Sequence, residues 1–163
     1  MRRPWSVTLL ALVASLAVAG TAVATHLPSF PNVTTASARG TLAELVKYNR
    51  DGIKVQTKNP VEIATLEVTF AAGSPTGASA GWHNHPGPVF VVIRSGTLSV
   101  WDEDCVKRTY SQGQSFFEAG SAENMLVKNE STTTDARVYA TFIVPVGTTS
   151  LRTGQAHLCG MAE

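Results

Sequence analysis

Residues 81–90 read GWHNHPGPVF, and this stretch carries the strongest signal in the chain for both fold and site. Side chains two residues apart on a β-strand point to the same face, so His83 and His85 can offer two imidazoles to one point in space. Imidazole suits Zn, Cu, Fe and Ni, but two neutral nitrogens need a third or fourth donor to hold such ions firmly. The alternative is a pair of histidines at a strand end that only hydrogen-bond to backbone.

From Ile53 onward, on both sides of this stretch, apolar and polar residues alternate with a period of two. In residues 62–70, Ala64, Leu66, Val68 and Phe70 share one face, which predicts a half-buried strand. No helix of ten or more residues is predicted after Tyr48, so we expect an all-β antiparallel sandwich or barrel. Further strands, separated by Gly, Pro, Asp and Asn, are predicted at Val89–Arg94, Thr97–Asp102, Val106–Tyr110, Met125–Asn129 and Arg137–Val144.

The first 24 residues have the layout of a signal peptide. Arg2 and Arg3 precede the apolar run Val7–Ala19, and Ala22-Val23-Ala24 has the small-x-small pattern at which signal peptidase cuts. An uncleaved membrane anchor is the alternative, but an apolar run of about 13 residues is short of the roughly 20 that span a bilayer. We therefore expect a secreted protein, extracellular or periplasmic, without membrane contact after cleavage.

Charge and cysteine content limit which classes of partner and which cellular compartment are expected. The chain has 13 Lys and Arg against 12 Asp and Glu, and Arg2 and Arg3 leave with the signal peptide. No basic block that could follow a phosphate backbone remains, which argues against nucleic acid as a partner. Cys105 and Cys159 are predicted to form a disulfide because an exported protein meets an oxidising compartment, and two unrelated thiols are the alternative.

The His-x-His stretch, followed by Gly96, resembles the first motif of the cupin superfamily, Gly…His-x-His…Glu…Gly. Residues 113–129 resemble a degraded copy of the second motif, Gly…Pro-x-Gly…His…Asn, and the resemblance covers roughly residues 53–147. It implies a jelly-roll barrel, or double-stranded β-helix, whose mouth holds a metal ion or a small ligand. The expected organisation is a signal peptide (1–24), an N-terminal arm and lead-in (25–51), the cupin barrel (52–147) and a C-terminal tail (148–163).

Two segments outside the predicted strands are harder to interpret. Residues 26–39 are polar, without a sustained period, and are expected to form an arm with no function of its own, whereas residues 42–48 fit a short helix or a strand equally well.

In the small secreted bacterial cupins that this chain resembles, a cysteine in the turn after residues 97–102 and one near the C-terminus both recur. The resemblance thus implies that the Cys105–Cys159 bridge ties the tail to the barrel.

The chain departs from the cupin pattern where that pattern supplies ligands. The Glu position falls on Val89 and the third His position on Asn124, whose amide oxygen is a weak ligand. A one-residue slip would let Glu123 complete a two-His-one-carboxylate set, and its alternative is an exposed loop carboxylate. The resemblance keeps an acid at Glu118 outside the ligand set, so Glu118 is interpreted as structural. The predicted ligands are His83, His85, Asn124 and Glu123.

These observations favour a secreted binding module for a small molecule or a weakly held divalent metal (Mn, Fe, Ni, Cu or Zn), with no catalytic residue identified. The alternative is a metal-dependent cupin enzyme of the dioxygenase, decarboxylase or isomerase type, in which Glu123 or Asn124 completes the site. A third hypothesis is a structural or interaction domain. The fold alone does not choose among them. Because cupins often pair through outer strands, a homodimer is a further expectation.

Overall fold

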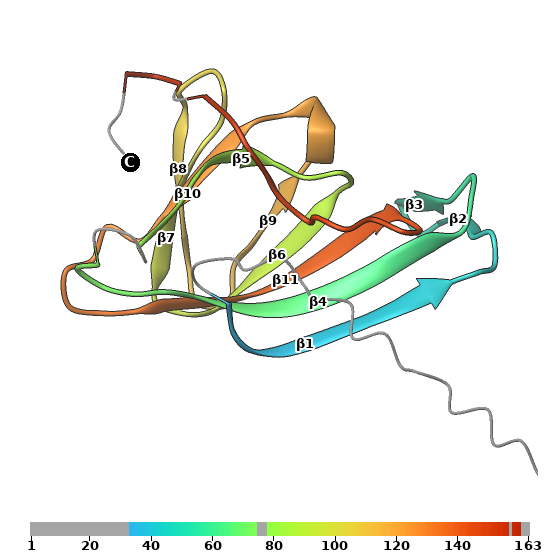
Figure 1. Cartoon of the computed structure of the whole chain (residues 1–163), viewed down its shortest axis with the longest axis horizontal. Coiled ribbons are helices and arrows are strands. Elements are labelled where there is room, and N and C mark those ends of the chain that lie inside the picture. The colour runs from blue at the N-terminus through green and yellow to red at the C-terminus, as the bar shows by residue number, and fades with distance from the viewer. Residues whose placement is uncertain (1–32, 75–77, 157, 161–163) are drawn as a thin grey trace, which may run out of the picture.

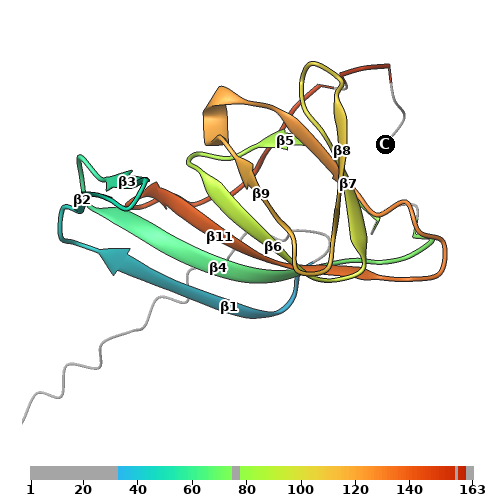
Figure 2. The same ribbon diagram turned by 180° about the vertical axis from the view of Figure 1, so that it is seen from behind.

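Two five-stranded antiparallel sheets face each other across a hydrophobic core (Figures 1 and 2). The computed structural model describes residues 33–74, 78–156 and 158–160, so the predicted signal peptide, residues 1–24, lies outside the described residues. Within the described part of the chain, no helix has the length and hydropathy of a membrane span. The strands are β1 (Val33–Leu42), β2 (Lys47–Arg50), β3 (Ile53–Gln56), β4 (Val61–Phe70), β5 (Ser79–Asn84), β6 (Val89–Ser95), β7 (Thr97–Trp101), β8 (Lys107–Ser111), β9 (Ser115–Glu118), β10 (Met125–Lys128), β11 (Ala136–Pro145) and β12 (Thr153–Gly154), with one 3-10 turn, η1 (Gly120–Ala122).

The order of the strands is that of a jelly roll. One sheet runs β1-β4-β11-β6-β9 and the other β12-β5-β10-β7-β8. The eight strands from β4 to β11 therefore form two four-stranded sets, β4-β11-β6-β9 and β5-β10-β7-β8, with successive strands crossing between the sheets except at the β7–β8 hairpin. This double-sheet arrangement confirms the predicted all-β jelly-roll fold.

The core forms because each strand turns its apolar set inward. On β4, Ala64, Leu66, Val68 and Phe70 are buried, which is the face that the period of two predicted. The β11 strand buries alternate residues in the same way and pairs with β4 over its whole length. All six predicted strands form, and each begins and ends within one residue of its predicted bounds.

The N-terminal segment contains strands that the sequence pattern did not predict. Strand β1 covers much of the expected arm and pairs with β4 at the edge of the sheet. Residues 42–48 contain the end of β1 and the start of β2, and β2 and β3 form a hairpin across Asp51 and Gly52, which both have positive φ. The β2 and β3 side chains are exposed. Strand β3 nevertheless lies where the predicted period of two begins, since Ile53 and Val55 alternate with Lys54 and Gln56.

The C-terminal residues form a segment that we call the strap, residues 151–156 with Leu158 and Cys159. Leu151 is fully buried in the main core, and β12 pairs with β5. The predicted disulfide is confirmed: Cys105 and Cys159 are bonded, with their Cα atoms 5.6 Å apart. Leu158 and Cys159 also pack against a second buried cluster formed by Trp82, Trp101 and Leu126. The strap is therefore fixed to the barrel along its length.

The loop between β5 and β6 passes so close to β11 that only glycine fits at position 87. An added Cβ would lie 2.1 Å from the carbonyl oxygen of Ile143. We expect Gly87→Ala to lower the free energy of unfolding by about 1–3 kcal/mol, because the backbone must move to relieve the overlap. Gly40→Ala is the matched control, since nothing lies within 4 Å of its Cβ position. Chemical denaturation checks both variants, and equal effects would contradict the close approach.

Candidate metal centre

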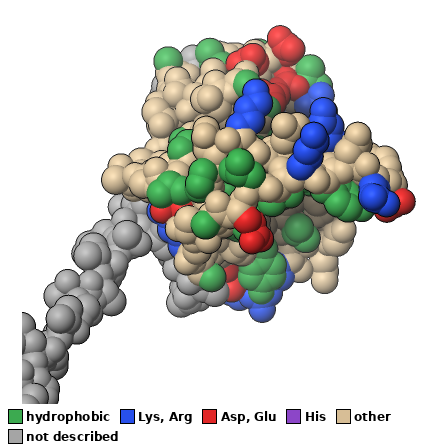
Figure 3. All heavy atoms as spheres, turned by 90° about the vertical axis from the view of Figure 1, so that its right-hand side faces the viewer, with side chains coloured by type: hydrophobic (Ala, Val, Ile, Leu, Met, Phe, Trp, Pro, Cys, Tyr) green, Lys and Arg blue, Asp and Glu red, His purple; other side chains and the backbone are tan. Residues whose placement is uncertain are grey.

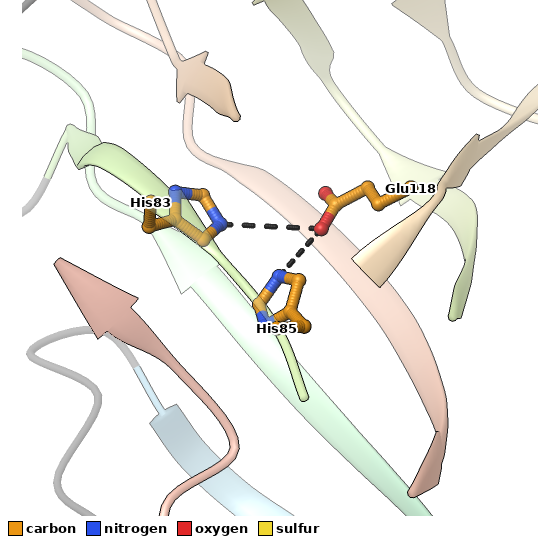
Figure 4. Close-up of side chains that lie close together, drawn as sticks. All are labelled: His83, His85 and Glu118. Carbon is orange, nitrogen blue, oxygen red and sulfur yellow. Dashed lines mark ion pairs between the residues drawn. The ribbon is translucent and has the colours of Figure 1, made fainter. Parts of the chain in front are cut away.

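Two histidines from β5 and its end meet a carboxylate from β9 inside the barrel (Figure 4). His83 lies on β5, His85 follows the last residue of that strand, and Glu118 is the last residue of β9. One ligand atom from each residue lies within 4.8 Å of the others. The three residues are only 3%, 4% and 5% exposed. In the described part of the chain, this is the group of three such side chains that could hold a metal ion.

The register of two strands explains how Glu118 comes to the site. Val89, which occupies the carboxylate position of the cupin motif, is directly paired with Glu118 across β6 and β9. Directly opposite residues of an antiparallel pair lie on the same face, with Cβ atoms about 4.5–5.5 Å apart. A carboxylate on β9 therefore occupies nearly the place that one on β6 would have reached. The cupin resemblance placed Glu118 outside the ligand set, whereas the structure brings its carboxylate together with His83 and His85.

Hydrogen bonds to backbone carbonyls orient both imidazoles. The Nδ1 of His83 lies 2.7 Å from the carbonyl oxygen of Gly81, and the Nδ1 of His85 lies 2.5 Å from that of Leu151. A carbonyl oxygen can only accept, so each Nδ1 carries the proton and each Nε2 is left toward Glu118. The backbone bonds that formed the alternative interpretation of this pair are thus present, and they are the contacts that prepare a histidine for metal binding.

Burial keeps one of the histidines in its ligand form. Desolvation lowers the pKa of His83 to about 4, although the nearby charge of Glu118 opposes the shift. His83 is therefore neutral at pH 7, with the lone pair of Nε2 available. His85 Nε2 lies 2.5 Å from Glu118 Oε2, and His83 Nε2 lies 3.9 Å from the same oxygen. The same oxygen therefore faces both Nε2 atoms, and metal binding requires these three donor atoms to be free of protons.

A small cavity opens beside these donors. Its volume is about 40 Å³, and Arg152 of the strap contributes to its lining. The rest of the wall is almost entirely apolar, since it is formed by Val68, Phe70, Ala80, Val89, Val91, Leu98, Phe116, Val127, Val138, Ala140 and Phe142. A ligand here would contact mostly hydrocarbon together with the four polar side chains.

The other two predicted ligands lie apart from this cluster. The Asn124 side-chain oxygen accepts a hydrogen bond from the Asn84 amide at 3.1 Å. Because Asn84 is between the two histidines on an extended chain, its side chain points to the opposite face. Glu123 is half-buried, and its charge acts on Arg108. The pKa of Arg108 is raised chiefly by its hydrogen bond to Asp102, and the charge of Glu123 is the smallest of the causes. Metal binding by Asn124 or Glu123 stays a prediction.

The outer surface carries a mixture of charges. On the face shown in Figure 3, basic, acidic and hydrophobic side chains are interspersed, and no histidine is visible there. His83 and His85 are hidden because they lie inside the barrel. The candidate chemistry of the described residues is therefore concentrated in the interior.

No protein-family model and no curated protein matches this chain. Similar solved structures include the cupin 2 conserved barrel domain protein from Leptotrichia buccalis, with 15% identity and a TM-score of 0.42 over 66% of this chain and 41% of that chain. A cupin-2 domain containing protein from Shewanella frigidimarina has 15% identity and a TM-score of 0.37 over 48% and 68%. The iron(II) form of HppE in complex with substrate has 17% identity and a TM-score of 0.42 over 61% of each chain.

These similarities concern the path of the chain alone and give no information about its chemistry. This chain spans less than two thirds of the length of the Leptotrichia protein and of HppE. The fold assignment rests on the strand order of the two sheets. By that order the chain is a jelly roll, and the solved structures similar to it include proteins named as cupins, the superfamily that its motifs resemble.

Proposed function

We propose that this protein is a divalent-metal-binding jelly-roll module of the cupin type, with His83, His85 and Glu118 as the metal ligands. The observation that carries the proposal is the convergence of two oriented imidazoles and one carboxylate, all buried, within 4.8 Å of one another. Buried titratable groups are costly unless they are paired or bind a metal, and this set has the donor types that first-row transition metals take.

The donor set is chemically suited to such an ion. Ligand bonds of about 2.1 Å in a tetrahedral site place donor atoms roughly 3.4 Å apart. The two Nε2 to Oε2 distances of 2.5 Å and 3.9 Å lie on either side of this value, so small side-chain rotations suffice. The sequence predicted weak binding because it offered two imidazoles and no motif carboxylate, and a third ligand should make binding tighter than that expectation. A bound metal would act as a Lewis acid and would leave coordination positions open to the cavity.

The test is a metal titration of the purified protein with its disulfide intact. We expect wild type to bind one Mn²⁺, Fe²⁺, Ni²⁺, Cu²⁺ or Zn²⁺ per chain, and His85→Ala to lower the affinity by at least about a hundredfold, since even an outer partner of a ligand is worth tenfold to a hundredfold. Calorimetry and metal content measure this effect. Glu123→Gln and Asn124→Ala are the controls. If these variants lose the metal and His85→Ala keeps it, the ligand set is wrong.

A metal-dependent enzyme is the second candidate. Two histidines and one carboxylate on one side of a metal, with open positions opposite, form the arrangement of non-haem iron(II) oxygenases. The largely apolar cavity beside the donors favours this candidate because it could shield a substrate from water. Oxygen uptake by Fe²⁺-loaded protein, with and without small organic acids, tests it. If the protein binds metal but consumes no oxygen, the enzyme candidate is rejected and the proposal of a binding module stands.

The compartment and the assembly are further proposals. Export through the residue 1–24 signal is supported by the Cys105–Cys159 disulfide, because such bonds persist in oxidising compartments. Mass analysis of secreted protein should show a chain beginning at Thr25. A homodimer is supported by exposed Phe90, Val92 and Phe117 on the outer face of the first sheet, and sedimentation tests it.

A further inference from the structure

The cavity beside the metal donors has a wall made mostly of hydrocarbon. Eleven of its fifteen lining residues are apolar, and they come from both sheets, with Val91 and Ala140 on one and Leu98 and Val127 on the other. These four side chains are between 0% and 6% exposed. Their strands each have a paired neighbour on both sides, so their backbone groups are engaged in the sheets and hydrocarbon faces the cavity.

The polar side chains that line the cavity already have partners in the protein. Nδ1 of His83 and of His85 contacts a backbone carbonyl oxygen, and Nε2 of each faces Glu118. The Arg152 guanidinium donates a hydrogen bond to the carbonyl oxygen of Ala80. A charged ligand would give up its hydration and would compete with these contacts, which is costly in a largely apolar site. An uncharged apolar ligand has neither cost.

Water is a poor occupant of the apolar part of this cavity. A buried water makes about three hydrogen bonds, and hydrocarbon side chains offer it no donor or acceptor. An apolar cavity of about 150 Å³ stays dry and binds benzene or xenon. The volume here is about 40 Å³. This is roughly a quarter of the benzene-sized cavity, so a ligand of about two or three heavy atoms fits.

We propose that this cavity binds a small uncharged apolar molecule of about two or three heavy atoms, and that the protein alone provides the site. Dioxygen and ethene are two molecules with this chemistry. The inference goes beyond the proposed function and does not depend on it, because binding comes from contact with the apolar wall and needs no metal ion. A molecule bound here would lie beside His83, His85 and Glu118, since these side chains line the same cavity.

Xenon is the probe for this site, because it is uncharged, apolar and detectable by its own nuclear resonance. The full protein with its disulfide intact is treated with a chelator, and xenon is titrated while the methyl signals of valine and leucine are followed. We expect saturable binding that shifts the methyl signals of Val91 and Leu98. Ethene and dioxygen should displace xenon, whereas formate, which is small but charged, should not. Displacement by one gas alone supports the inference and identifies the preferred molecule.

Ala140→Val adds two carbon atoms to the wall, so we expect it to weaken xenon binding by at least about tenfold. Because it fills space, it should leave the free energy of unfolding unchanged or raise it. Ala64→Val is the matched control, since Ala64 lies in the same core on neighbouring β4 but does not line the cavity. The control should bind xenon as wild type does and should be less stable, because the added carbons meet close-packed side chains.

Three results would overturn the inference: wild-type xenon affinity in Ala140→Val, shifts confined to methyl groups outside the cavity, or displacement by formate as effective as that by the gases. Absence of xenon binding to wild type would overturn it too, while the proposed function would still be decided by the metal titration. If Ala140→Val does not fold, Ala80→Val decides, because it fills the same cavity from the facing sheet.

Discussion

Glu118→Val should lower the affinity for divalent metals by at least about a hundredfold, and adding Val89→Glu to it should restore most of that affinity. The single change removes the only carboxylate among the three donors and leaves two imidazoles. The double variant moves the carboxylate to the residue directly opposite on β6, and both positions line the same cavity. Side-chain composition and volume are unchanged, so core packing is disturbed little.

The matched control places the carboxylate one inward position further along the same strand. Val91→Glu combined with Glu118→Val has the same composition, but Val91 pairs with Phe116, about 7 Å along the ladder from the Val89 pair. We expect no recovery of metal binding in this control. Calorimetric titration of the single variant and the two double variants provides the comparison. Wild-type affinity in Glu118→Val would contradict the assignment of Glu118 and favour Glu123 as the third ligand.

Removing the disulfide should lower the free energy of unfolding by about 2–4 kcal/mol, the usual value for a bridge that closes a long loop. The two cysteines are 54 residues apart, and replacing both with serine breaks the covalent link without leaving a free thiol. Cys105 and Cys159 both have positive φ, and serine is strained there as cysteine is. The difference between the proteins therefore reports the bond. The midpoint of thermal unfolding should fall by roughly 10 °C.

The same double variant should also bind metal less tightly. Leu151 supplies the carbonyl that accepts from His85 Nδ1, and the strap that contains it would lose its covalent anchor. Loss of such an orienting partner costs about tenfold to a hundredfold in metal affinity. Wild type treated with a reductant under native conditions is the control and should behave as the double variant does. Unchanged stability in both would show that packing alone holds the strap.

Much of the fold was predictable because a strand with one buried face has apolar residues at every second position. The apolar face of β4 and the turn residues between the later strands located the strands of the jelly roll. Strand β1 was missed because it lies at a sheet edge, where pairing is made by backbone groups, and its exposed positions from Ala38 to Thr41 are a mixture of small and polar residues.

The site was predictable in its histidines and not in its carboxylate. His83 and His85 share a face by local geometry alone, whereas the pairing of Val89 with Glu118 depends on a register between β6 and β9, which are separated by the β7–β8 hairpin. One signal was present in the sequence: Phe116 and Glu118 alternate with Phe117, so an apolar residue and an acid share one face of β9. Deciding which face is inward required the three-dimensional fold.

The position of the strap in the chain sets an order of assembly. Leu151, Arg152 and β12 follow all eight jelly-roll strands in the sequence, yet they supply the acceptor for His85 and the cation of the cavity. A growing chain can therefore pair all eight jelly-roll strands before its metal centre is complete. The strap is synthesised after these strands and Cys159 must then be oxidised, so maturation of the site waits for the strap and depends on the redox state of the compartment.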